Sequence, residues 1–184
     1  MCELVYVTLA GSSKKAIVNS IYFTVKEFIK KNIKSVEKLS ILIIKSNTSP
    51  IKKESIKTSI TEYFSLSKEL SDIKIEFFEE KVVPEHMLID IFKEIQNELV
   101  PFLDNNQNKL IIVDLTASRK IMSIGLTLSI IEYWKKKKNN NVFVSYYLLK
   151  KFYDNKEKIT IELFPDEFSV EIWSIKDLEV IFSE

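Results

Sequence analysis

The sequence predicts an α/β fold with a doubly wound, mostly parallel, Rossmann-like sheet. Compact runs of β-branched and aliphatic residues alternate along the chain with segments whose apolar residues recur at helical spacing. The apolar runs lack the polar alternation of half-exposed strands, as expected for strands covered by helices on both faces. Alternation of strands and helices in this order is typical of a parallel sheet. The 184 residues, of which 46% are hydrophobic and 29% charged, suffice for one packed domain.

The elements are expected in a regular order. Strands are expected in residues 4–9, 39–44, 73–78, 110–115 and 142–149, and helices in 16–29, 51–70, 88–99 and 119–136. The turn at 46–50, Ser-Asn-Thr-Ser-Pro, is expected to cap the second helix. The sequence thus predicts a Rossmann-like domain over residues 1–150.

Residues 151–184 are expected to form a short β-rich C-terminal extension of the same domain. Strands are expected in 159–164 and 168–173, on either side of a Pro-Asp pair, whereas the pattern in 175–182 fits a strand or a helix.

Composition excludes several classes of function. The 27 basic and 26 acidic side chains nearly cancel, so long duplex nucleic acid is not an expected partner. Cys2 is the only cysteine, which excludes an internal disulfide and a thiolate zinc site. No apolar run has the length of a membrane span, and no signal-like start is present, so a cytoplasmic protein without membrane contact is expected.

The standard cofactor and catalytic motifs are missing from the sequence. It has neither a dinucleotide glycine fingerprint nor a phosphate-binding glycine-lysine loop, and no cofactor or metal is expected. His86 is the sole histidine and is expected at a helix start, which argues against a Ser-His-Asp triad. The Glu-Glu-Lys triplet at 79–81 faintly resembles a metal-nuclease motif, but these residue types are so common here that we attribute it to chance.

Two loops are the candidate ligand site. In a doubly wound sheet, ligands bind at the carboxyl ends of the strands where the strand order reverses, and the first and fourth strands are usually neighbours there. Their loops, 10–15 and 116–120, carry hydroxyls and lysines and lead into helix N-termini, which favour anions. Gly11 would let a ligand approach the backbone, and Arg119, the only arginine, suits phosphate.

Each of these residues has a simpler structural interpretation. Ser12 and Ser13 are typical helix-capping residues, and Asp114 at a strand end is placed to cap a helix beginning near Ser118. The lysines at 14, 15 and 120 could be ordinary solvated surface charges, which is where lysine side chains are usually found. Convergence of the two loops at one switch point is what favours a binding site.

The loop sequences resemble those of CRISPR-associated Rossmann-fold (CARF) proteins, especially the stand-alone ring nucleases of archaea. Residues 114–123 read Asp-Leu-Thr-Ala-Ser-Arg-Lys-Ile-Met-Ser, where the family has Asp-Leu-Thr-Gly-Gly-Thr/Arg-Lys followed by Met. Residues 7–13 read Val-Thr-Leu-Ala-Gly-Ser-Ser, where it has a Thr-Leu-Gly-Thr-Ser-Pro-like stretch. The second match is the weaker one, and two glycines of the first motif are replaced by Ala117 and Ser118. The general resemblance covers about residues 1–150.

The resemblance implies a homodimer whose two-fold axis passes through a cyclic oligoadenylate, with the tetra-adenylate as the expected ring. It implies metal-independent cleavage, in which Ser12 orients the ribose or binds the phosphate and Lys120 or Arg119 stabilises negative charge. The implied ligand-binding residues are Gly11, Ser13, Lys14, Thr48, Thr116, Ala117, Ser118 and Met122. Lys150 or Lys151 would cover the ring.

Two alternatives stay open at this point. A sensor or regulator would bind the same ligand without cleaving it. However, 151–184 is too short and too strand-like for a winged helix, and the family's Arg-x4-6-His nuclease motif is absent. An unrelated flavodoxin-like or signalling domain is the other alternative.

Overall fold

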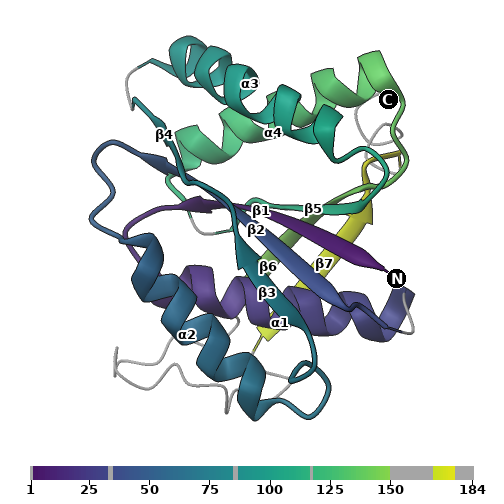
Figure 1. Cartoon of the computed structure of the whole chain (residues 1–184). Helices are drawn as coiled ribbons and strands as arrows, with labels where there is room; N and C mark the ends of the chain where they lie inside the picture. The colour runs from purple at the N-terminus through teal and green to yellow at the C-terminus, as the bar shows by residue number, and fades with distance from the viewer. Residues whose placement is uncertain (1, 33–34, 85–86, 117, 150–167, 177–184) are drawn as a thin grey trace.

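The computed structural model describes residues 2–32, 35–84, 87–116, 118–149 and 168–176 (Figure 1). The strands are β1 (Glu3–Ala10), β2 (Lys38–Ser46), β3 (Lys74–Phe77), β4 (Lys81–Val83), β5 (Leu110–Asp114), β6 (Val142–Leu149) and β7 (Phe168–Ser174). The helices are α1 (Lys14–Asn32), α2 (Lys53–Leu66), α3 (Leu88–Asn105) and α4 (Lys120–Lys137).

These elements form one mixed sheet with the order β3-β2-β1-β5-β6-β7, and the short β4 also pairs with β2. All pairs are parallel except β6 with β7, which are antiparallel. The chain fills the sheet from β1 towards β3 and then crosses over to β5, which pairs with β1 on its other side. The predicted fold class and the predicted switch point are therefore confirmed.

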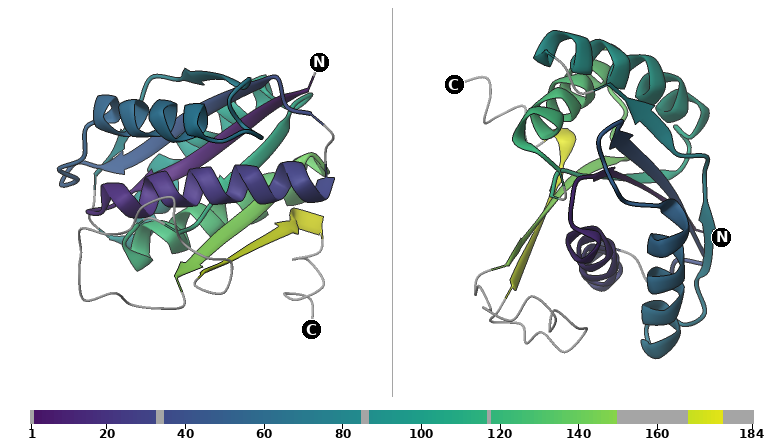
Figure 2. Two further views of the ribbon diagram at one scale, coloured as in Figure 1. Left: turned by 90° about the horizontal axis from the view of Figure 1, so that it is seen from below. Right: turned by 90° about the vertical axis from the view of Figure 1, so that its left-hand side faces the viewer.

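Helices cover both faces of the sheet, α1 and α2 on one face and α3 and α4 on the other (Figures 1 and 2). Successive residues of β1 alternate between the two cores: Tyr6 packs in the α1/α2 core, whereas Val5 and Val7 pack in the α3/α4 core. Both sets of side chains are fully buried. This two-sided burial is the physical reason for the uninterrupted apolar runs in the sequence.

One local prediction was wrong, and one strand was not predicted. The turn at 46–50 does not cap α2, because the N-cap residue is Lys52 and it makes no side-chain capping bond. The strand β4 was missed: it is three residues long, and Val82 at its centre is exposed, so it leaves no apolar run to detect. The charged residues beside it form ion pairs, Glu80 with Lys45 at 2.7 Å and Lys81 with Glu98 at 2.9 Å.

The C-terminal extension is described in part. The strand predicted at 168–173 is observed as β7, which extends the sheet beside β6. The strand predicted at 159–164 and most of the tail at 175–182 lie outside the described residues. No helix in the described ranges is long and apolar enough to cross a membrane.

Candidate functional site

Three loops meet at the carboxyl edge of the sheet, where β1, β2 and β5 end. Between them lies a small pocket of about 30 Å³, which we call the strand-end crevice. Its lining residues are Ala10, Gly11, Ser12, Ser46, Thr48, Ser49, Pro50, Ser118, Arg119 and Met122. The structure therefore brings six of the predicted site residues together in one place: Gly11, Ser12, Thr48, Ser118, Arg119 and Met122.

The two adjacent serines of the first loop, Ser12 and Ser13, have different roles. The Ser13 hydroxyl accepts a hydrogen bond from the Ala16 N–H at 3.2 Å, so Ser13 caps α1, as the simpler interpretation expected. Ser12 is exposed and lines the crevice, and its hydroxyl makes no hydrogen bond within the described part of the chain. Lys14 is the first residue of α1 and is also exposed.

Gly11 is held in place by the third loop. The Ser49 hydroxyl donates a hydrogen bond to the Gly11 carbonyl oxygen at 2.8 Å. Gly11 does not have a positive φ, so its backbone conformation is one that other residues also adopt. The value of a glycine here is the open access that its missing side chain gives to the crevice.

The second loop begins at a buried carboxylate. Asp114 is completely buried; one carboxylate oxygen accepts a hydrogen bond from the Thr8 hydroxyl at 3.0 Å. The other oxygen accepts from the Thr116 N–H at 3.0 Å and from the Thr116 hydroxyl at 2.5 Å. The interpretation of Asp114 as a cap for the following helix was wrong, because α4 begins at Lys120 with Arg119 as its N-cap residue.

Burial raises the pKa of Asp114, and hydrogen bonds from Thr116, Ser20 and Thr8 partly oppose that rise. Burial, with a smaller contribution from the Asp114 charge, also raises the pKa of the Tyr6 hydroxyl well above its ordinary value. Asp114 therefore lies beneath the site as an ionisable group in a low-dielectric environment, not as a ligand contact.

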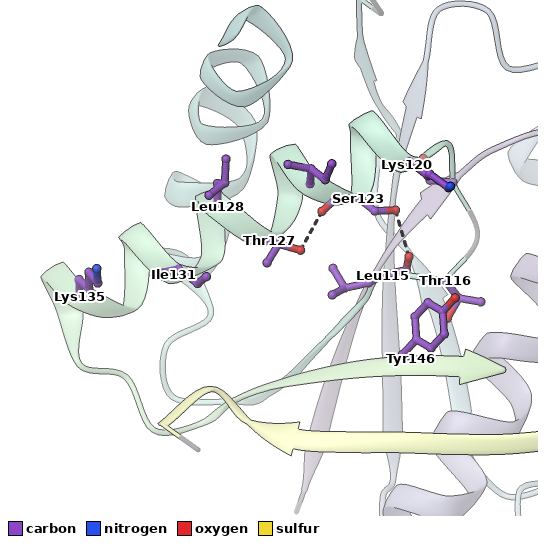
Figure 3. A pocket seen from close by; sticks show the side chains of 11 residues that line it. Leu115, Thr116, Lys120, Ser123, Thr127, Leu128, Ile131, Lys135 and Tyr146 are labelled. Carbon is purple, nitrogen blue, oxygen red and sulfur yellow. Dashed lines mark hydrogen bonds between the residues drawn. The ribbon is translucent and has the colours of Figure 1, made fainter. Parts of the chain in front are cut away.

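A second, larger concavity runs along α4, and we call it the α4 groove. It has a volume of about 670 Å³ and is lined by Leu115, Thr116, Ser118, Lys120, Ser123, Ile124, Thr127, Leu128, Ile131, Lys135 and Tyr146. Figure 3 shows that these side chains come from α4, the segment that precedes it and β6, with Lys120 at one end of the helix and Lys135 at the other. Ser118 lines both the groove and the strand-end crevice, so the two adjoin at this residue.

The α4 groove exposes more apolar surface than sequence reasoning anticipated. Ile124, Leu128 and Tyr146 are 48%, 44% and 41% exposed, and Leu148, two residues further along β6, is 47% exposed. Large apolar side chains exposed together mark a surface that another molecule covers. Their helical spacing on α4 was visible in the sequence, but it does not tell which face of the helix is left uncovered.

Some predicted residues lie elsewhere. Thr116 and Lys120 line the α4 groove, not the crevice, and Ser13 and Lys14 line neither. Ala117, Lys150, Lys151 and His86 lie outside the described residues. The contribution of Ser46, Ser49 and Pro50 was missed, although the parallel pairing of β1 with β2 places the two loops at the same edge. Across the described ranges, no three His, Cys, Asp or Glu side chains gather as metal ligands would.

The fold is similar to that of Csm6 from Enterococcus italicus, solved bound to cyclic hexa-2'-fluoro-hexa-dAMP. The TM-score is 0.54 over 98% of this chain, with 12% sequence identity, and this chain spans 44% of the Csm6 chain. At that identity the similarity establishes the fold alone. A mutant ferredoxin-NADP+ reductase from Plasmodium falciparum with 2'P-AMP has a TM-score of 0.35 with 16% identity over 79% of this chain and 53% of its own, which supports no argument. No protein-family model and no curated protein matches the sequence.

Proposed function

We propose that this protein binds a cyclic oligoadenylate, with the tetra-adenylate as the expected ring, and cleaves it as a CARF ring nuclease that ends type III CRISPR signalling. The observation that carries the proposal is the convergence of three hydroxyl-bearing loops and the lone arginine at the switch point. The fold is that of a protein solved with a cyclic adenylate ligand, which supports the same ligand class. A cytoplasmic location belongs to this proposal.

The size of the strand-end crevice favours a ligand held by two copies of the chain. A volume of about 30 Å³ is roughly that of one water molecule, far below the pocket needed to enclose a nucleotide. A ring with two-fold symmetry instead suits an isologous dimer, in which each copy supplies one crevice. We assign the α4 groove to the second copy, because the groove is apolar and adjoins the crevice at Ser118.

The proposed reaction is a transesterification within the ligand. A ribose 2′-oxygen attacks its adjacent phosphorus and forms a new O–P bond, while the bond from phosphorus to the 5′-oxygen breaks. The 2′-hydroxyl loses its proton, the departing 5′-oxygen gains one, and a 2′,3′-cyclic phosphate remains, without any metal. Ser12 would hold the attacking ribose in line, and Arg119 or Lys120 would stabilise charge on the phosphorane-like transition state.

Incubation of the protein with radiolabelled cyclic tetra-adenylate in EDTA tests the whole proposal. We expect linear products ending in a 2′,3′-cyclic phosphate. Binding without turnover would establish the sensor instead, and absence of binding would overturn both. One observation favours the sensor: among the described residues, the crevice lining contains neither a carboxylate nor an imidazole to act as general base.

Adjacent serines provide a matched pair of variants. Ser12→Ala should lower the cleavage rate about 100-fold while weakening binding much less, because the lost contact acts on the reacting groups. Ser13→Ala should instead lower the free energy of unfolding by about 1 kcal/mol through loss of the helix cap, with little change in rate per folded molecule. Single-turnover rates and dissociation constants separate these effects. Equal losses of rate and affinity in Ser12→Ala would reduce Ser12 to a ligand contact.

A further inference from the structure

The hydroxyl of Thr116 is completely engaged inside the protein. It donates a hydrogen bond to the Asp114 carboxylate at 2.5 Å. It accepts one from the Ser20 hydroxyl at 3.2 Å and one from the Tyr147 N–H at 2.8 Å. A hydroxyl has one donor and two acceptor positions, so no position is left for a ligand. Thr116 was predicted as a ligand-binding residue, but its hydroxyl connects parts of the protein.

Each partner of this hydroxyl belongs to a different element. Asp114 ends β5, Ser20 lies in α1, and Tyr147 lies in β6. The paired register of β5 and β6 ends at Asp114 opposite Ser145, so the Tyr147 N–H lies beyond the last paired residue of β5. The Thr116 side chain supplies its acceptor there, and one side chain thus joins two strands and a helix.

This junction lies between the two predicted ligand loops. The helix α1 begins at Lys14, immediately after the first loop, and Ser20 is buried in its second turn. The second loop starts at Thr116, and its far end is tied by the Ser123 hydroxyl, which donates to the Leu115 carbonyl oxygen at 3.1 Å (Figure 3). Thr116 thus joins the start of the second loop to the helix that follows the first loop.

We propose that Asp114 and Ser20 are positioning residues, which act through the Thr116 hydroxyl to hold the two ligand loops in register. The proposal rests on the proposed function, since it assigns to these loops a shared ligand. Because both residues are buried, they influence the ligand only through the loop. When the two loops are already in their reactive arrangement before the ligand binds, less activation free energy is needed to align the reacting groups. Loss of this arrangement therefore reduces the cleavage rate more than the binding affinity.

Amide hydrogen exchange in the ligand-free protein tests the junction directly. Ser20→Ala removes one of the three hydrogen bonds of the Thr116 hydroxyl, together with the 3.4 Å hydrogen bond between the Ser20 and Tyr6 hydroxyls. Thr116→Val removes all three bonds of the Thr116 hydroxyl while preserving side-chain shape. Both variants should speed exchange in peptides covering 118–123, and the Tyr147 amide should exchange faster in Thr116→Val. Thr116→Ser, which restores the hydroxyl, should return the exchange to that of the natural protein.

A matched control distinguishes positioning from ordinary loss of stability. Ser129 is as buried as Ser20, but its hydroxyl donates only to the Gly125 carbonyl of its own helix, at 2.8 Å. Ser129→Ala should lower the melting temperature about as much as Ser20→Ala and leave exchange in 118–123 unchanged. Equal exchange of that segment in Ser20→Ala, Ser129→Ala and the natural protein would overturn the proposal, whether or not the ligand binds.

Kinetics with cyclic tetra-adenylate provide the second test. Ser20→Ala should lower the single-turnover rate about fivefold with little change in dissociation constant, and Thr116→Val should lower it at least about tenfold. Because both substitutions break the same junction, Ser20→Ala should have almost no further effect in the Thr116→Val background. Additive effects would overturn the proposal. Failure of the natural protein to bind the ring would instead overturn the proposed function, and the exchange measurement would still decide the role of the junction.

Discussion

The strand-end crevice and the α4 groove share Ser118 but differ in volume and in the polarity of their lining residues. The crevice is tiny and half of its lining residues carry a hydroxyl, whereas the groove is about twenty times larger and exposes mostly apolar surface. A cavity as small as the crevice cannot enclose a ligand, even where its polar groups converge. An apolar cavity with few polar groups cannot orient a ligand. The difference is the reason why our proposal gives ligand binding to the crevice and association with a second copy to the groove.

The largest expected effect follows from placing a charge in the groove. Leu128→Glu should dissociate the proposed dimer and weaken cyclic tetra-adenylate binding at least about 100-fold, because the interface would bury an unpaired carboxylate and each monomer would then hold half of the proposed site. Sedimentation velocity and binding titration measure both consequences. Leu66→Glu is the matched control, since Leu66 is an exposed leucine of α2 outside the groove. A Leu128→Glu protein that stays dimeric would refute the assignment of the groove.

A smaller effect distinguishes the two lysines at the ends of the groove. Lys120 lies at the α4 N-terminus beside Ser118, and Lys135 lies near the other end of the helix. Lys120→Gln should weaken ligand binding about tenfold and reduce its salt dependence, because one phosphate contact per subunit is lost. Lys135→Gln should change neither. Titrations at several salt concentrations decide this, and equal losses in the two variants would place the ligand along the groove.

The smallest effect concerns the carboxylate beneath the crevice. Burial raises the pKa of Asp114 above its ordinary value of 3.8, so folding favours the protonated form. The stability that this provides is present below the unfolded-state pKa and is lost as pH rises through the folded-state pKa. Asp114→Asn removes this loss: its amide oxygen still accepts from Thr116, and its NH₂ can donate to Thr8. We expect a gain of about 1–2 kcal/mol in the free energy of unfolding at neutral pH.

Denaturant titrations of Asp114→Asn and the natural protein across pH check the sign. The advantage of the asparagine variant should grow as pH rises above the ordinary pKa of 3.8 and vanish below it. An advantage that shrinks with increasing pH would mean that the ionised carboxylate stabilises the fold. Cleavage rates of the same variant then report whether the charge itself serves the reaction.

Much of the fold was predictable because its signals are local. Each strand carries its own apolar run and each helix its own periodicity, so the order of elements followed from the sequence. The missed strand β4 lacks such a run, because Val82 at its centre is exposed and Lys81 at its start forms an ion pair with Glu98. The capping role predicted for 46–50 failed because α2 begins only at Lys53, beyond this turn, and the Ser49 hydroxyl donates to the Gly11 carbonyl of another loop.

The sequence by itself determined that the loops at 10–15 and 116–120 meet, since parallel strands that bury both faces end at one edge of the sheet and these loops follow two neighbouring strands. Tertiary structure alone decided which hydroxyls face outwards. Ser13 caps a helix while Ser12 stays open, and Thr116 turns its hydroxyl to three internal partners. It also decided that Ile124 and Leu128 remain uncovered. These outcomes depend on what packs against each residue, and no local pattern contains that information.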